Sequence, residues 1–188
     1  MQITQTPRIP LAARAAASFG VGLFLTFSQS HSAATGLLAL GIFGLSYGLL
    51  SGTASIVFQK GLAAIESIPL TVVALLIGGF ALMVPGTIAS AGQNSTAAVA
   101  FKMLVTGWAI IAGAFELYQA RRAGFKTTTG RDLLITSSFG LLLALLFLVA
   151  NLDIVSQVGF FGAYLLLSGV HLGISATSPA AKSSTTKA

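Results

Sequence analysis

The chain has very little charge. Only 7% of its 188 residues are Asp, Glu, Lys or Arg, whereas 55% are apolar, and a soluble domain usually carries roughly a quarter charged residues. A soluble protein this poor in charge could not cover its surface, whereas a lipid bilayer accepts an apolar exterior. The composition therefore excludes an ordinary soluble domain and predicts an integral membrane protein whose main partner is the lipid bilayer.

Residue types that carry most catalytic and metal chemistry are also scarce. The chain has no Cys, four acidic residues and two His, which excludes disulfides and thiolate sites and argues against a metal site with three or more protein ligands. The sequence contains no zinc-binding HExxH motif, no GxSxG nucleophile elbow and no phosphate-binding loop. We therefore expect no catalytic residues, no metal, no cofactor and no enzymatic activity.

Six apolar runs follow one another along the chain. Each reaches or approaches the length of about 20 residues that crosses a bilayer core of about 30 Å. The pattern predicts an all-α membrane protein with six transmembrane helices. The predicted spans cover residues 11–28, 33–58, 70–91, 97–120, 133–150 and 154–176.

The connections between these spans alternate in length. Those at residues 29–32, 92–96 and 151–153 are very short, and short connections make neighbouring helices antiparallel. Longer polar connections lie at residues 59–67 and 121–131. We therefore predict three antiparallel helical hairpins that form one transmembrane domain, preceded by a short cytoplasmic segment and followed by a disordered cytoplasmic tail. The hairpins cover residues 11–58, 68–120 and 132–177, the domain 11–177, the first segment 1–10 and the tail 178–188.

The basic residues predict the orientation. In the six-span arrangement nine of the ten Lys and Arg residues fall on one side, and only Lys102 falls on the other. Cytoplasmic loops carry such an excess, so both termini are expected in the cytoplasm. Because these charges sit at the ends of apolar runs, the net charge of +6 does not indicate nucleic-acid binding. The nine residues are Arg8, Arg14, Lys60, Arg121, Arg122, Lys126, Arg131, Lys182 and Lys187.

The first apolar run has one alternative interpretation. Arg8 and Arg14, the apolar stretch and the small residues near Ser30 and Ser32 also fit a signal peptide. Its removal would leave five spans and would break the pattern of three hairpins.

The second, fourth and sixth spans share a spacing in which an aromatic residue is followed five positions later by glycine. The pairs are Phe43 and Gly48, Trp108 and Gly113, and Tyr164 and Gly169. Chance alignment of 21 glycines is the simplest alternative, but the equal placement in each hairpin favours a unit that occurs three times.

Glycines in these spans also form faces of small residues. Gly44, Gly48 and Gly52 recur at every fourth position, as do Gly169 and Gly173, and Gly113 lies at the equivalent place in the fourth span. In lipid, such faces let helix backbones approach closely. We expect them to pack helices within the chain, with an interface between two copies, and so a homo-oligomer, as the alternative.

Two ionisable residues lie inside predicted spans at matching depth. Glu116 is in the fourth span and His171 in the sixth, and an intramembrane carboxylate usually faces protein or water. We predict Glu116 and His171 as a candidate functional pair on the cytoplasmic side, with Arg121 and Arg122 able to neutralise Glu116. A histidine in such a pair could respond to acid. The alternative is that both are ordinary interfacial residues.

The two aspartates are predicted to cap helices. A carboxylate at a helix N-terminus meets free backbone N–H groups, so Asp132 is expected to cap the fifth span and Asp153 the sixth. The depth of Trp108 and Tyr164 predicts that both pack in the interior.

The hairpin pattern resembles that of the HdeD-like membrane proteins, a bacterial family of small six-helix proteins. The resemblance extends over Ala12–Ala176, although Asn151 stands where a turn proline is usual in the family. It implies a bacterial inner-membrane protein with a link to acid or general stress resistance, and it implies no catalytic residues. The matching segments are RDLLITSSFGLLLALLFLVANLD from Arg131, GFFGAYLLLSGVHLGISA from Gly159, LLIGGFALMVPG from Leu75 and GWAIIAGAFELYQARR from Gly107.

We therefore expect a non-enzymatic, stress-associated membrane protein. The main alternative is a small transporter or channel, for which broken helices and polar groups at the bilayer midplane are typical. Pro85 with Gly86 is the main interruption of a span, and it lies towards one end. A membrane-embedded enzyme is a third alternative, and the sequence does not identify any protein partner.

Overall fold

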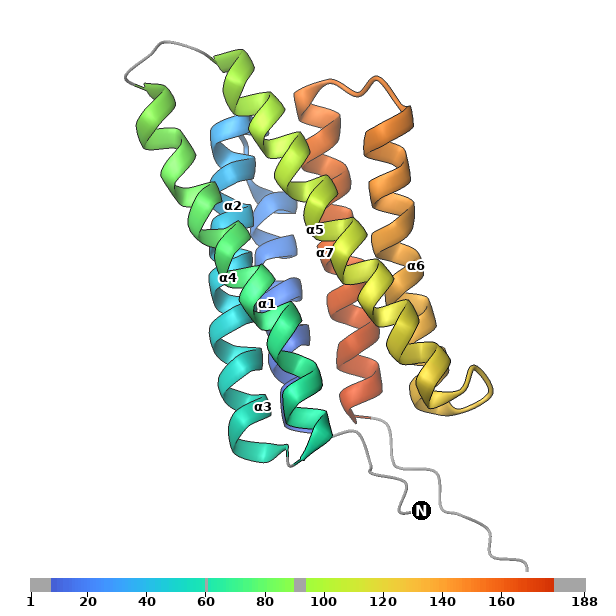
Figure 1. Cartoon of the computed structure of the whole chain (residues 1–188). Helices are drawn as coiled ribbons and strands as arrows, with labels where there is room; N and C mark the ends of the chain where they lie inside the picture. The colour runs from blue at the N-terminus through green and yellow to red at the C-terminus, as the bar shows by residue number, and fades with distance from the viewer. Residues whose placement is uncertain (1–7, 60, 90–93, 178–188) are drawn as a thin grey trace, which may run out of the picture.

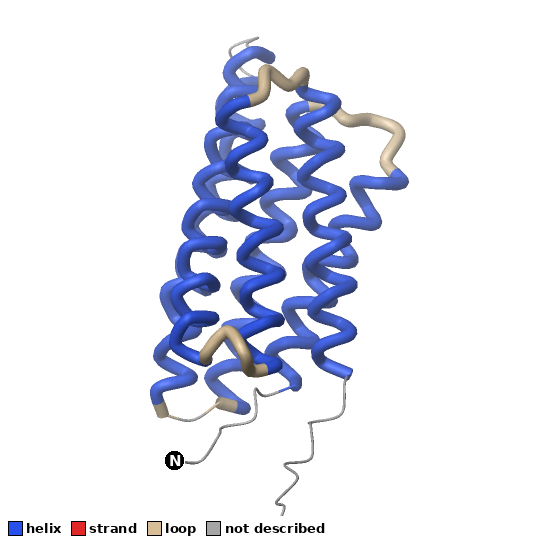
Figure 2. Tube along the Cα trace, turned by 90° about the vertical axis from the view of Figure 1, so that its right-hand side faces the viewer, coloured by secondary structure: helices blue, strands red, loops and turns tan. Residues whose placement is uncertain are grey.

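A computed structural model describes residues 8–59, 61–89 and 94–177. Within these ranges the regular structure is helical and includes no strand. The helices run up and down along one axis (Figure 1), and their connections gather at the two ends of the bundle (Figure 2). They are α1 (Arg8–Phe27), α2 (Ala33–Ser46), the π-helical η1 (Tyr47–Ser51), α3 (Gly52–Phe58), α4 (Leu62–Ala89), α5 (Asn94–Ala123), α6 (Thr128–Val149) and α7 (Ile154–Thr177).

Six helical segments in these ranges are long and apolar enough to cross a membrane, as expected for a multi-pass membrane protein. The second of them is the continuous run α2–η1–α3. Large apolar side chains cover the outer surface: Leu148 is 62% exposed, Val149 78% and Met83 69%. Such a surface is stable in contact with lipid tails. The predicted number of spans is confirmed, while residues 1–7 of the predicted N-terminal segment and the predicted tail lie outside the described residues.

Two connections are shorter than the sequence pattern predicted. Helix α4 begins at Leu62 and so includes Pro69, which was expected to precede it. Helix α5 continues to Ala123 and α6 starts at Thr128, so only a four-residue turn joins them. Gly124 ends α5 with a positive φ of 88°, a conformation that glycine adopts without strain.

One of the two predicted aspartate caps is confirmed. The Asp153 carboxylate accepts a hydrogen bond of 3.3 Å from the Ser156 backbone N–H at the start of α7, and hydrogen bonds from Ser156 lower the pKa of Asp153. The prediction for Asp132 is wrong, because α6 begins four residues earlier. Thr127 caps that helix by accepting the Gly130 backbone N–H at 3.0 Å.

The closest helix contacts join successive predicted hairpins. Helix α2 packs along α4, α5 along α6, and α7 along α1. Helices α2, α5 and α7 also contact one another, and their aromatic residues meet at the centre of the bundle. The Phe43 ring lies 5.3 Å from Trp108 and 6.2 Å from Phe161, both edge-on.

The candidate packing glycines lie at these close contacts. A Cβ atom on Gly44 would be 2.5 Å from the Ala74 carbonyl oxygen, and one on Gly169 would be 2.6 Å from the Phe19 backbone nitrogen. Gly48 faces Leu75 and Thr71, Gly52 faces Thr71, and Gly113 faces Leu141. Gly173 differs from these, because its nearest neighbour, the Ala15 Cβ, is at an ordinary contact distance of 3.9 Å.

Candidate functional site

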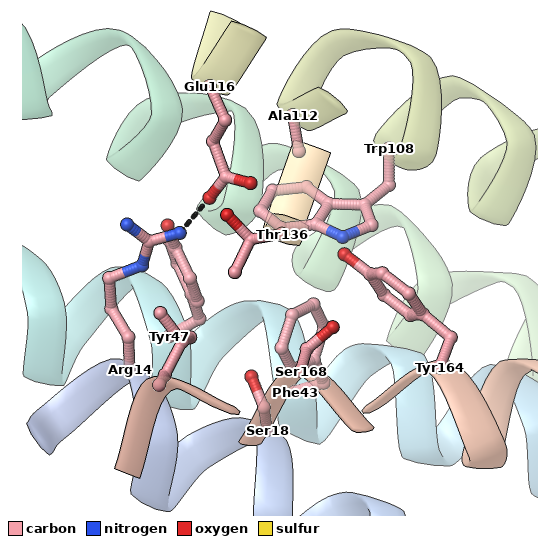
Figure 3. Close-up of a pocket in the computed structure, with 11 residues that line it drawn as sticks. Arg14, Ser18, Phe43, Tyr47, Trp108, Ala112, Glu116, Thr136, Tyr164 and Ser168 are labelled. Carbon is pink, nitrogen blue, oxygen red and sulfur yellow. Dashed lines mark hydrogen bonds and ion pairs between the residues drawn. The ribbon is translucent and has the colours of Figure 1, made fainter. Parts of the chain in front are cut away.

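The Arg14 guanidinium on α1 donates a hydrogen bond to the Glu116 carboxylate on α5, and the two form an ion pair inside the bundle (Figure 3). The Arg14 side chain is 15% exposed and the Glu116 side chain 7%. Arg14 lies six residues after the start of α1 and Glu116 seven residues before the end of α5, so each is about 10 Å along its helix. Charges at such depth are unfavourable unless paired, which explains why the two residues meet.

Aromatic residues surround the pair. The Arg14 guanidinium carbon lies 5.3 Å from the centre of the Tyr47 ring, within the range of a cation–π contact. The Tyr47 ring packs edge-on against Trp108 at 5.2 Å. Tyr47 is also the first residue of the π-helical turn η1, and such single π-turns are frequent at functional sites.

A small cavity adjoins the ion pair. Its volume of about 10 Å³ is enough for about one water molecule. Side chains from α1, α2, η1, α5, α6 and α7 converge on it (Figure 3). The lining residues are Arg14, Ser18, Phe43, Tyr47, Trp108, Ala112, Glu116, Thr136, Tyr164, Ser168 and Leu172.

Three buried polar atoms of this lining have no hydrogen-bond partner: Arg14 Nε, Trp108 Nε1 and Ser168 Oγ. Trp108 and Ser168 nevertheless have a polar neighbour, because the Tyr164 hydroxyl interacts with both side chains (Figure 3). Trp108 is 2% exposed and Ser168 5%. The ion pair therefore lies beside a buried polar cluster formed by Trp108, Tyr164 and Ser168.

The predicted partners Glu116 and His171 take part in separate interactions. Glu116 pairs with Arg14. His171 on α7 instead faces Asp132 on α6: its Nε2 lies 3.3 Å from the Asp132 carbonyl oxygen and 4.0 Å from Oδ1. The His171 ring also packs edge-on against Phe139 at 6.3 Å. The structure therefore does not bring the two side chains together, because each has different neighbours.

Arg122 was predicted to neutralise Glu116, but it pairs with a different carboxylate. Arg122 donates a hydrogen bond to Glu66 on α4, and its guanidinium lies 6.0 Å from the Tyr118 ring centre. The Arg122 side chain is 50% exposed, so this second pair is a surface contact that contributes little to stability.

The sequence pattern did not identify Arg14 as a site residue, because a basic residue near the end of an apolar run also fits a topology signal. One feature of the sequence could have identified Arg14 as a partner of Glu116. Arg14 interrupts the first apolar run and Glu116 lies at similar depth in the fourth, and opposite charges inside spans usually pair with one another. Tyr47, Ser18, Thr136 and Ser168 carry no comparable signal, because hydroxyl residues are common in membrane helices.

Comparison of the chain with models of protein families, with curated proteins and with solved structures finds no match. The features of the molecule that bear on its function are the six-helix bundle and the buried polar cluster around Arg14 and Glu116.

Proposed function

We propose that this chain is a non-enzymatic integral membrane protein of the bacterial inner membrane that contributes to acid or general stress resistance. The observation that supports the proposal best is the ion pair of Arg14 and Glu116 between α1 and α5. A carboxylate can take up a proton in acid, and its loss of charge would remove the attraction that joins the two helices. The resemblance to HdeD-like proteins agrees with such a role.

We expect a strain without this gene to survive acid exposure less well than its parent. A plasmid copy of the native gene should restore survival, whereas a Glu116→Gln copy should restore it only in part because the carboxamide does not titrate. Glu66→Gln removes the carboxylate of the exposed pair and serves as the matched control. Equal survival of the deletion strain and its parent, in acid and in other stresses, would contradict the proposal.

A small transporter or channel is the second candidate. It is favoured by the same ion pair, because ionisable residues inside spans often mark pathways for ions or protons. The small volume of the cavity, about 10 Å³, argues against it, since ligand sites usually measure about 300–1,000 Å³. A flux of solute into proteoliposomes that requires the native pair would favour this candidate.

We also propose that both termini lie in the cytoplasm. The proposal rests on the nine basic residues that share one side of the six-span order. A reporter that is active only in the periplasm should be inactive when fused after Ala188. It should be active when inserted in the connection between α1 and α2, at Ser30. The opposite pattern of activity would reverse the orientation.

We further infer that the three hairpins are copies of one repeated unit arranged as a ring. In each unit the second helix brings an aromatic residue towards the centre and a glycine against the first helix of the next unit. Gly48 contacts α4, Gly113 contacts α6 and Gly169 contacts α1. If the units are copies, these glycines should coincide within one helical turn when the hairpins are superposed.

A further inference from the structure

The connection between α5 and α6 gathers positive charge. Arg121 and Arg122 lie in the last turn of α5, Lys126 lies in the connection, and Arg131 lies in the first turn of α6. All four residues are exposed. The connection lies at the end of the bundle where α1 begins and α7 ends (Figure 1). Because the two helices are joined by a short turn, the four cations share a small area of the surface.

Little acidic charge lies near this turn. Two of the four acidic residues of the chain are elsewhere, because Glu116 is inside the bundle and Asp153 caps α7 at the opposite end. Glu66 on α4 lies beside the turn, but its carboxylate pairs with Arg122. Glu66 therefore balances one of the four cations, and three remain.

The last acidic residue, Asp132, is directed towards another helix. It follows Arg131 in the sequence, but successive residues on a helix do not face each other. The Oδ1 atom of Asp132 lies 4.0 Å from the Nε2 atom of His171 on α7. The ion pairs among the described residues include neither Arg121, Lys126 nor Arg131. These three cations are therefore available to an anion outside the chain.

Apolar side chains continue from the turn along the outer surface of the bundle. On α6, Arg131 begins a face of exposed residues that continues with Ile135, Leu142 and Val149, which are 40%, 62% and 78% exposed. In the turn itself, the Phe125 side chain is 48% exposed. A ligand that fits this surface has a negative group next to long apolar chains, which is the chemistry of an anionic phospholipid.

We propose that Arg121, Lys126 and Arg131 bind the headgroup of an anionic phospholipid whose acyl chains lie along α6. The phosphate accepts hydrogen bonds from the guanidinium groups, which match its oxygen atoms in pairs, and from the Lys126 ammonium group. Phe125 contacts the chains near the headgroup. An acidic soluble protein would meet the same charges but would leave the apolar face of α6 unused. This inference goes beyond a role in stress resistance and does not depend on it.

Lipids with brominated acyl chains test this surface, because bromine quenches the emission of an indole that it contacts. Phe125→Trp places such a probe in the turn. The native protein contains a single tryptophan, Trp108, which is 2% exposed, so its emission supplies the background. The vesicles contain one phosphatidylglycerol molecule for every four of phosphatidylcholine. Both leaflets have this composition, so the result does not depend on the orientation of the protein.

Two sets of proteoliposomes differ only in the lipid that carries the bromine. In the first set the phosphatidylglycerol is brominated, and in the second an equal number of phosphatidylcholine molecules is brominated. A protein without a lipid preference would be quenched equally by both, since their charge and bromine content are the same. We expect the first set to quench the added indole at least about twofold more, because each surface cation attracts anionic lipid. High salt should reduce the difference.

Further substitutions in the Phe125→Trp protein locate the interaction. Lys126→Gln together with Arg131→Gln removes two cations of the surface, so the two lipid sets should then quench almost equally. Lys102→Gln removes a cation from the other half of α5 and should keep the full difference. Soluble glycerol phosphate carries the charge of the headgroup without its chains. At the concentration of the lipid it should leave the difference in place.

Equal quenching of the Phe125→Trp protein by the two sets would overturn the proposal and would favour an acidic protein segment as the partner. A difference that Lys102→Gln removes as completely as the double substitution does would also overturn it, as would one that glycerol phosphate abolishes. The native protein offers a check that needs no substitution. After mild detergent extraction from the same vesicles, its bound lipid should be enriched in phosphatidylglycerol, and a lack of enrichment would contradict the proposal.

Discussion

Replacing Arg14 with Met should lower the free energy of unfolding by about 3–5 kcal/mol, the usual effect of removing one partner from a buried ion pair. The Glu116 carboxylate would remain with a side-chain exposure of 7% and without its cation. The measurement is reversible unfolding in mixed detergent micelles, followed by circular dichroism. Arg122→Met, which removes the cation of the exposed pair, is the matched control and should cost much less.

The effect of Arg14→Met should depend on pH. In this variant Glu116 becomes less unfavourable once it is protonated, so the loss of stability should be smaller at pH 5 than at pH 8. Glu116→Gln leaves a guanidinium that stays charged, so the loss of stability in this variant should change little over the same pH range. Equal losses at both pH values for Arg14→Met would show that Glu116 does not carry the buried charge.

The double variant Arg14→Met/Glu116→Leu separates the ion pair from simple packing. Apolar replacement of both members of a buried pair is often neutral or stabilising. We therefore expect the double variant to be more stable than Arg14→Met alone, and close to the native protein. A loss equal to the sum of the two single losses would show that the residues act independently.

The sequence was sufficient to predict the number and the approximate positions of the spans. Long apolar runs have few structural alternatives, because every backbone polar group in lipid must be satisfied within the segment. The ends of the helices were less predictable. Arg121 and Arg122 suggested the start of a loop, but the helix continues until Gly124 ends it with a positive φ. A helix can extend beyond the apolar region wherever water satisfies its surface.

The site was predicted only in part, because the sequence does not show which helices are neighbours or where their side chains point. The depth of Glu116 along its helix follows from the sequence, and this placed it correctly inside the bundle. Its partner depends on which helix lies beside α5 at that depth and on which direction each side chain points. Sequence spacing aligned His171 with this position, yet the side chain of His171 faces Asp132 on α6. The first helix, which supplies Arg14, is distant in sequence and came close through packing on α7.

The second large loss of stability is expected when alanine replaces a glycine at a close helix contact. A Cβ atom on Gly78 would lie 2.8 Å from the Leu45 backbone nitrogen and 3.0 Å from the backbone of Gly44. Backbone atoms cannot move aside as a flexible side chain can. Gly78→Ala should therefore separate α2 from α4 and lower stability by about 1–3 kcal/mol, the usual effect of overpacking.

The neighbouring residue Gly79 is the matched control, because a Cβ atom there meets nothing within 4 Å. Gly79→Ala should leave stability unchanged or raise it by up to about 1 kcal/mol, since alanine favours the helix more than glycine does. The same contrast should appear in α7, where Gly169→Ala meets the Phe19 backbone and Gly159→Ala meets open space. The unfolding assay described for Arg14 measures all four variants. If alanine were tolerated at Gly78 and Gly169 as well as at Gly79 and Gly159, the helices would not depend on glycine for their close approach, and the repeated glycines would lose their structural explanation.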